Sequence, residues 1–167
     1  MKRVRLGRSG LMVSPLAIGT LTMSPLQKNL PPERGAEILL YATEKGVNLF
    51  DTAQYYDTYE PLRLALKKRP DLLVSTKSYA YDRAGAEAAF EEARKALDMD
   101  VIPIFLMHEQ EDRLTLKGHR EAFDFYLEQK AKGKILAVGF STHRVAAVDY
   151  APRYPGVDVV FPLINVT

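Results

Sequence analysis

The sequence predicts an α/β protein that forms an incomplete (β/α)8 barrel of the TIM type, preceded by an N-terminal β-hairpin. Apolar runs alternate with amphipathic segments along the chain, which is typical of a parallel sheet with helical crossovers. No Gly-rich phosphate loop follows the first strand, as it would in a dinucleotide-binding open sheet. Residues able to do chemistry end nearly every apolar run, which favours the mouth of a barrel over a single switch point.

The expected elements follow one order, a hairpin and then strands alternating with helices. We expect the hairpin over residues 2–13, strands over 15–19, 49–51, 72–77, 102–108, 136–141 and 159–165, and helices over 32–45, 59–68, 82–97, 116–132 and 145–151.

Turn and cap residues set most of these boundaries. Gly-containing turns interrupt the alternation of residues 2–13 and indicate the hairpin. Pro32 begins the first long helix and Gly46 ends it, because Pro suits a first helical turn and Gly suits a C-terminal stop. Asp82 precedes the Ala- and Glu-rich helix, and Gly133 ends the next long one.

Length and composition indicate one domain, residues 1–167, with a sizeable core. The net charge of +2 comes from interspersed charges and gives no case for nucleic acid or an anionic membrane as a partner. No apolar run approaches the roughly 20 residues that cross a bilayer. The chain has no cysteine, which excludes disulfides and iron–sulfur ligation, and no metal site is predicted. We therefore expect a cytoplasmic protein.

The expected barrel is incomplete. A full barrel has eight strands and about 250 residues, whereas this chain has 167 residues and six expected parallel strands. We therefore interpret the chain as about three quarters of a barrel. We expect the remainder to be a missing C-terminal segment, or to be supplied by a partner or an oligomer.

Four strand ends carry the candidate site residues, namely Asp51, Lys77, His108 and Ser141. Tyr55 and Tyr56 follow Asp51 in one loop. Each residue alone has a plain structural explanation: a capping Asp, a packing Tyr, a solvated Lys or a core His. Their joint occurrence at successive strand ends favours a functional site. Tyr55 is expected to be structural, and His119 and His143 are assigned to surface or capping roles.

The motifs together resemble the aldo-keto reductase family over essentially the whole chain. They are Leu6–Leu16 with Gly19-Thr20, Asp51-Thr52-Ala53-Gln54-Tyr55-Tyr56, Thr76-Lys77, His108 and Gly133–Ser141. The shortened loop after Tyr56 and the run Met107–Glu111 resemble a bacterial branch in which an iron–sulfur segment can follow the barrel.

The resemblance implies NAD(P)H-dependent reduction of a small aldehyde or ketone to an alcohol. In that chemistry the nascent alkoxide must be protonated as it forms. Tyr56 would be the general acid, and a nearby Lys77 cation would lower the pKa of its phenol. Asp51 would hold Lys77, and His108 would donate to the carbonyl oxygen and orient the substrate.

The resemblance also implies a nicotinamide cofactor, NADPH with NADH as the alternative, contacted by Gly19, Thr20, Asp51 and Ser141. Thr142 stands where the family has an Asn that holds the carboxamide. The Gln that the sixth strand usually brings is not identified, and Asn165 is considered for that role. The basic residues that grip the adenosine and 2′-phosphate follow strands seven and eight in the family.

Two other functions stay open. The chain could be a non-catalytic barrel fragment or subunit that folds with a partner, which a concentration-dependent particle mass would support. It could also be a barrel lyase or isomerase that forms a Schiff base at Lys77, which borohydride would trap with substrate.

Overall fold

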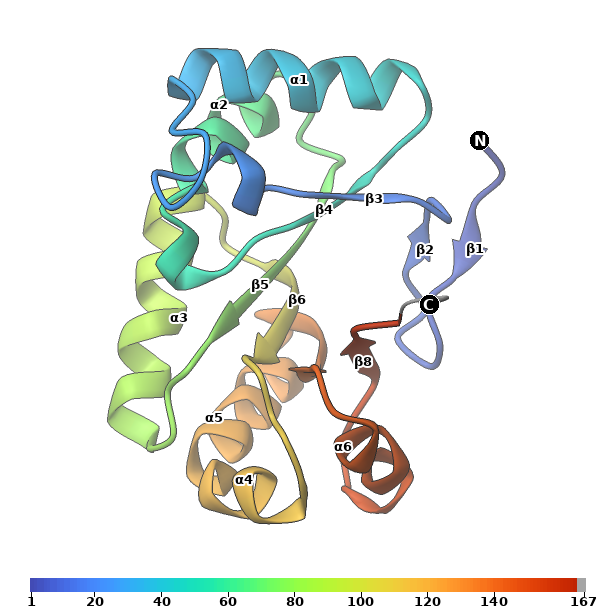
Figure 1. The fold of residues 1–167 in the computed structure, drawn as a ribbon, viewed down its shortest axis with the longest axis vertical. Coiled ribbons are helices and arrows are strands. Elements are labelled where there is room, and N and C mark those ends of the chain that lie inside the picture. The colour runs from blue at the N-terminus through green and yellow to red at the C-terminus, as the bar shows by residue number, and fades with distance from the viewer. Residues whose placement is uncertain (165–167) are drawn as a thin grey trace.

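The computed structural model describes residues 1–164 and shows a parallel six-stranded sheet that curls into a half-barrel (Figure 1). The strands pair in chain order and are β3 (Ala17–Gly19), β4 (Leu49–Asp51), β5 (Leu73–Ser78), β6 (Ile102–Met107), β7 (Ile135–Thr142) and β8 (Val159–Pro162). Parallel neighbours require a crossover between each pair, which the strand–helix alternation supplies. The predicted incomplete barrel is confirmed.

Helices cover the outer face of this sheet, and the predicted hairpin lies across the sheet from α1, α2 and α3 (Figure 1). The helices are α1 (Pro32–Glu44), α2 (Tyr59–Lys68), α3 (Arg83–Leu97), α4 (Arg113–Gly118), α5 (Arg120–Ala131) and α6 (Val145–Tyr150). Short 3₁₀ turns are η1 (Leu21–Met23), η2 (Gln54–Tyr56) and η3 (Ala151–Arg153), and the hairpin pairs β1 (Val4–Arg5) with β2 (Met12–Val13). Within residues 1–164, no helix combines the length and apolar character needed to span a membrane.

The single helix expected over 116–132 is wrong, because two helices occupy this region. The first begins earlier, since the Asp112 side chain accepts from the backbone of Leu114 and Thr115 and forms a capping box. It ends at Gly118, and His119 leaves the helical conformation with φ −98° and ψ 16°. The last strand is also shorter than expected. It ends at Pro162, and Asn165 lies outside the described residues.

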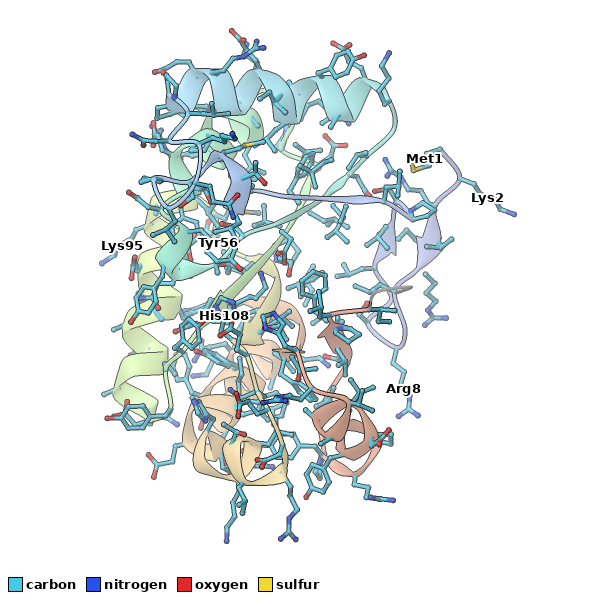
Figure 2. The ribbon with its side chains drawn as sticks, viewed as in Figure 1. Met1, Lys2, Arg8, Tyr56, Lys95 and His108 are labelled. Atoms are coloured by element: carbon cyan, nitrogen blue, oxygen red, sulfur yellow. The ribbon has the colours of Figure 1, made fainter. Side chains whose placement is uncertain are left out.

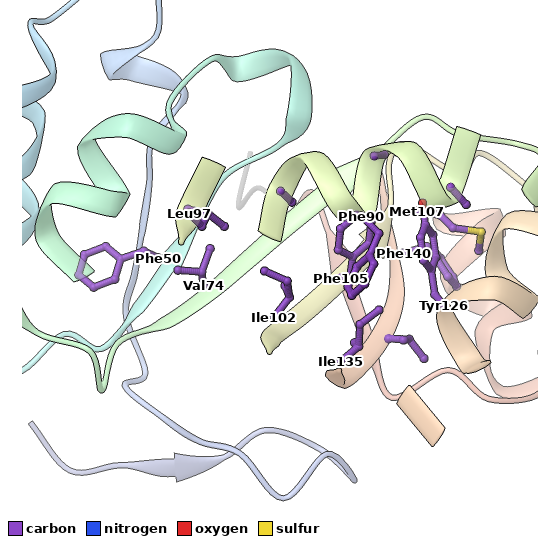
Figure 3. Close-up of a cluster of buried hydrophobic side chains, with 14 of the residues drawn as sticks. Phe50, Val74, Phe90, Leu97, Ile102, Phe105, Met107, Tyr126, Ile135 and Phe140 are labelled. Atoms are coloured by element: carbon purple, nitrogen blue, oxygen red, sulfur yellow. The ribbon is translucent and has the colours of Figure 1, made fainter. Parts of the chain in front are cut away.

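The two faces of the sheet have different cores because side chains alternate along each strand. On the outer face, Phe50, Phe105 and Phe140 pack beneath the helices (Figure 3). On the inner face, Ile104, Leu106 and Ala137 form a small cluster against which the hairpin packs through Leu6 and Leu11. The hairpin thus covers an apolar inner layer, whereas the C-terminal ends of the strands carry polar side chains.

Gly139 is a strict packing requirement of this sheet. A Cβ at this position would overlap the carbonyl oxygen of Val159 on the neighbouring strand. We predict that Gly139→Ala lowers the free energy of unfolding by about 2–3 kcal/mol, because β7 and β8 would have to separate. Urea denaturation followed by circular dichroism measures this loss.

Gly118→Ala is the matched control, because a Cβ there meets nothing within 4 Å. This variant is expected to be as stable as the wild type, or more stable by up to about 1 kcal/mol. Equal stability of the Gly139→Ala and wild-type proteins would contradict the described pairing of β7 with β8.

Candidate active site

A buried ion pair lies at the C-terminal ends of β4 and β5. The register places Asp51 opposite Ser75, so Lys77, two residues further on, faces the same inner side. The Lys77 Nζ atom donates to Asp51 Oδ2 at 2.6 Å and to the Thr52 carbonyl at 2.7 Å. Lys77 is only 1% exposed. A charge this deeply buried requires such partners, since unpaired burial is very costly.

Three threonine hydroxyls hold the end of β4 in place. Thr20 donates to the Asp51 carbonyl at 3.2 Å and shares a 2.6 Å hydrogen bond with Thr58. Thr52 and Thr58 share another at 2.8 Å. The side chain of Thr20, predicted to contact a cofactor, is therefore fully buried and engaged within the protein. Gly19 pairs with Asp51 at the exposed end of β3.

Tyr56 and His108 meet beside this ion pair (Figure 2). The η2 turn carries Tyr56, and Asp57 in the left-handed conformation then turns the chain into α2. The Tyr56 hydroxyl lies 3.4 Å from His108 Nε2, and Lys77 Nζ lies 5.2 Å from the centre of the Tyr56 ring. The structure thus brings together Asp51, Tyr56, Lys77 and His108, as predicted for a site.

The expected pKa of Tyr56 is wrong in direction. Burial raises the pKa of its phenol, and the carboxylates of Asp51 and Glu109 raise it further. The reason is geometric, because Lys77 donates to Asp51 and Thr52 and lies over the ring of Tyr56 rather than against its hydroxyl. Tyr56 is therefore a neutral, protonated phenol over the physiological pH range.

Burial is also the main cause of the pKa shifts of the other three residues of the site. It lowers the pKa of Lys77 and raises the pKa of Asp51, and in each case the partner's charge opposes the shift. Burial, aided by the Lys77 charge, lowers the pKa of His108 to about 4, so the imidazole is neutral near pH 7. Its Nδ1 is buried without a partner among residues 1–164. We assign the proton to Nε2, because a buried unpaired N–H is rarer than an unpaired acceptor.

Ser141 is buried at the end of β7, where its Oγ accepts from the backbone N–H of Glu109 at 2.9 Å. Its own hydroxyl proton has no acceptor within the described part of the chain. Thr142 is used differently, since its Oγ1 exchanges hydrogen bonds with the backbone of Arg144 in a turn. Glu109 itself has a φ of 51°, an uncommon conformation for a non-glycine residue.

Sequence reasoning missed three residues that surround the site. Tyr79 stacks on the His108 ring with a centroid distance of 4.3 Å, and the Phe161 ring centre lies 5.4 Å from Lys77 Nζ. Period-2 alternation from Lys77 and Val159 places both side chains inward and could have found them. The third is Glu109, whose left-handed backbone has no sequence signal. Tyr55, expected to be structural, is 64% exposed and stacks on Tyr79 at 5.6 Å.

The residues present fit the nicotinamide end of a dinucleotide. Asp51 Oδ1 is buried without a donor among the described residues, and a ribose hydroxyl is a donor of the required kind. The unused proton of Ser141 suits a carboxamide oxygen. Thr142 and Thr20, in contrast, already use their hydroxyls within the fold.

The structure thus places a Lys–Asp pair, a Tyr and a neutral His at the mouth of a curled parallel sheet. The family model described as aldo/keto reductase family matches residues 15–166. The chain belongs to this family of oxidoreductases. Methylglyoxal reductase DkgA of Escherichia coli O157:H7 is 28% identical over 128 residues, which span 74% of this chain and 45% of that relative.

Solved structures match over nearly the whole chain. A Pseudomonas aeruginosa protein assigned to the aldo-keto reductases superposes with a TM-score of 0.86 and 28% identity, covering 98% of this chain and 68% of that one. The thermostable aldo-keto reductase Tm1743, bound to the inhibitor epalrestat, superposes with a TM-score of 0.80 and 25% identity, covering 99% of this chain and 63% of that one. A Bombyx mori aldo-keto reductase in complex with NADP superposes with a TM-score of 0.79 and 18% identity, covering 98% of this chain and 58% of that one. It shows the shared fold.

The low pKa of His108 predicts a pH-dependent stability. Its pKa is about 4 in the folded chain and 6.5 ordinarily, so only the unfolded state gains the proton as pH falls between these values. The free energy of unfolding is therefore unaffected by this histidine above pH 6.5, and it falls by up to about 3 kcal/mol as the pH is lowered towards 4. We predict that His108→Gln loses less stability than the wild type between these pH values, measured by urea denaturation.

The exposed His143 provides the control for this titration. The His143→Gln variant should keep most of the wild-type pH dependence, because His143 is the smallest of the causes that act on the pKa of His108. If His108→Gln and the wild type lost stability in parallel between pH 6.5 and 4, the buried neutral imidazole would be the wrong description.

Proposed function

We propose that this chain forms the catalytic end of an NAD(P)H-dependent reductase that converts an aldehyde or ketone to an alcohol. The observation that carries the proposal is the 3.4 Å separation of the Tyr56 hydroxyl and His108 Nε2. Two neutral donors this close can share one carbonyl oxygen as acceptor. Membership of the aldo/keto reductase family supports the same chemistry.

In this proposal His108 holds the carbonyl oxygen and Tyr56 protonates it. The Nε2–H of His108 donates to the oxygen and fixes its direction, which stabilises the charge that develops there. The Tyr56 O–H bond breaks as the new alcohol O–H bond forms, and the phenolate later regains a proton from water. A bound nicotinamide supplies the hydride that forms the new C–H bond.

The ion pair lies beside the proposed proton donor. Lys77 Nζ lies 5.2 Å from the centre of the Tyr56 ring, so its attraction for a phenolate opposes the effects of burial and of the Asp51 and Glu109 carboxylates. Asp51 keeps Lys77 in position through the 2.6 Å hydrogen bond. Asp51 Oδ1 and Ser141 would hold the cofactor, together with the exposed end of β3 at Gly19. We favour NADPH over NADH, in line with the NADP complex of the Bombyx mori protein.

We further propose that residues 1–167 act as a single domain in the cytoplasm and that further β-α units close the barrel. Support comes from β3 and β8, which lie at the two ends of the sheet order and, within residues 1–164, each pair on one side only. A C-terminal segment, a partner or a second copy could supply those units. Particle mass measured over a range of concentrations distinguishes an assembly from a monomer.

Schiff-base chemistry at Lys77 fits this site less well. An amine nucleophile must be unprotonated and accessible. Lys77 Nζ is buried and donates to both Asp51 and the Thr52 carbonyl, as an ammonium does.

Removing the proton donor tests the proposed function. We predict that Tyr56→Phe lowers kcat for aldehyde reduction by about a hundred- to ten-thousand-fold, the usual contribution of general acid catalysis. NADPH binding should persist, since the ring stays in place. The measurements are NADPH oxidation with a panel of small aldehydes and a fluorescence titration of NADPH.

Tyr81→Phe removes a hydroxyl from an exposed tyrosine outside the four-residue site and serves as the control. It should retain kcat within roughly twofold, as surface substitutions commonly do. A Tyr56→Phe variant that reduces aldehydes at the wild-type rate would eliminate Tyr56 as the acid.

A further inference from the structure

Three aromatic rings form a column that leads from solvent to the imidazole of the site. Tyr55 and Tyr79 stack at 5.6 Å with an interplanar angle of 20°, and Tyr79 and His108 stack at 4.3 Å and 25°. Exposure falls along the column, from 64% for Tyr55 to 37% for Tyr79 and 4% for His108. The column joins η2, the end of β5 and the end of β6.

Hydrogen bonds alone leave the plane of this imidazole weakly held. A functional histidine is usually oriented by a hydrogen bond to its second ring nitrogen. His108 Nδ1 has no such partner among residues 1–164. The contact between Nε2 and Tyr56 is long, at 3.4 Å. What restrains the ring is packing, with Tyr79 against its face and Tyr56 in an edge contact at 5.7 Å.

We propose that Tyr79, backed by Tyr55, is a positioning residue for His108. Its ring fixes the imidazole plane and excludes water from one face, so that Nε2 stays directed at Tyr56 and at a substrate oxygen. This inference deepens the proposed function and rests on it for its catalytic consequence. The orientation and shielding of His108 are measurable without any catalysis.

The effect of Tyr79 on proton binding follows from two opposing forces. A phenol face attracts an imidazolium, which would favour protonation. Exclusion of water disfavours it, and burial is the largest cause of the low pKa of His108. The charged groups that act on His108 are Lys77 and His143, which lower its pKa, and Glu109, which raises it. Of these groups only Glu109 interacts with the Tyr79 hydroxyl, so Tyr79→Phe measures that contribution separately from the loss of shielding in Tyr79→Ala.

The test is an NMR titration of the His108 imidazole in the full chain. We expect Tyr79→Ala to raise the pKa of His108 by about one unit from its value of about 4, and Tyr79→Phe, which removes only the hydroxyl that interacts with Glu109, to change it by much less. Tyr55→Ala should give a smaller rise, because it removes only the outer ring. Tyr81→Ala is the matched control, since Tyr81 is also 64% exposed but packs near His119.

Kinetics separate positioning from a general loss of structure. Tyr79→Ala should lower kcat at least tenfold with little change in KM, and Tyr79→Phe should restore kcat, since the stack needs the ring and not the hydroxyl. An unchanged His108 pKa in Tyr79→Ala, or an equal rise in Tyr81→Ala, would overturn the inference. If Tyr79→Ala does not fold, the comparison of Tyr55→Ala with Tyr81→Ala decides it.

The titration also distinguishes this inference from the proposed function. If the chain reduces no aldehyde but Tyr79→Ala raises the pKa of His108 as predicted, the positioning role of Tyr79 stands and the proposed reductase activity fails. If the chain reduces aldehydes but the pKa of His108 does not rise in Tyr79→Ala, the proposed activity stands and the positioning role fails.

Discussion

The site depends on the burial of one lysine. Lys77 is almost completely enclosed, and its ammonium is stable there because Asp51 and the Thr52 carbonyl both accept from it. That pairing requires β4 and β5 to lie in the register that sets Asp51 opposite Ser75, two residues before Lys77. The threonine hydroxyls of Thr20 and Thr58 then fix the strand end from which η2 carries Tyr56. One electrostatic constraint therefore organises the β3, β4 and β5 ends of the barrel mouth.

The charges of the site balance in the resting state, and this balance shapes its chemistry. Asp51 already compensates the Lys77 cation, so the pKa of Tyr56 is raised by burial and by carboxylates rather than lowered. The neutral His108 adds no charge of its own near pH 7. The proposed reaction therefore takes a proton from a phenol whose pKa the site does not lower. The carbonyl oxygen must gain negative charge from hydride transfer before it can take that proton.

Much of this architecture is readable in the sequence, because alternation and strand order are strong local signals. The apolar runs that end at Asp51, Lys77 and His108 predicted both the parallel sheet and the residues that meet at its mouth. Other features depend on spatial relations that single residues do not encode. Side chains of α4 and α5 suit one helix, and the break lies at His119, whose backbone angles leave the helical range. The pKa of Tyr56 depends on which acceptors Lys77 reaches, which only the folded geometry decides.

The most direct test of the central claim is a fluorescence titration of NADPH into the full chain, with Asp51→Asn and Asp57→Asn compared side by side. Asp57 is exposed and left-handed, a conformation that Asn tolerates, so its variant changes charge near the site without touching the ion pair. If the Lys77–Asp51 pair builds a nicotinamide site, the wild-type and Asp57→Asn chains bind NADPH saturably and Asp51→Asn binds at least tenfold more weakly. Saturable binding that is equal in all three chains would contradict it.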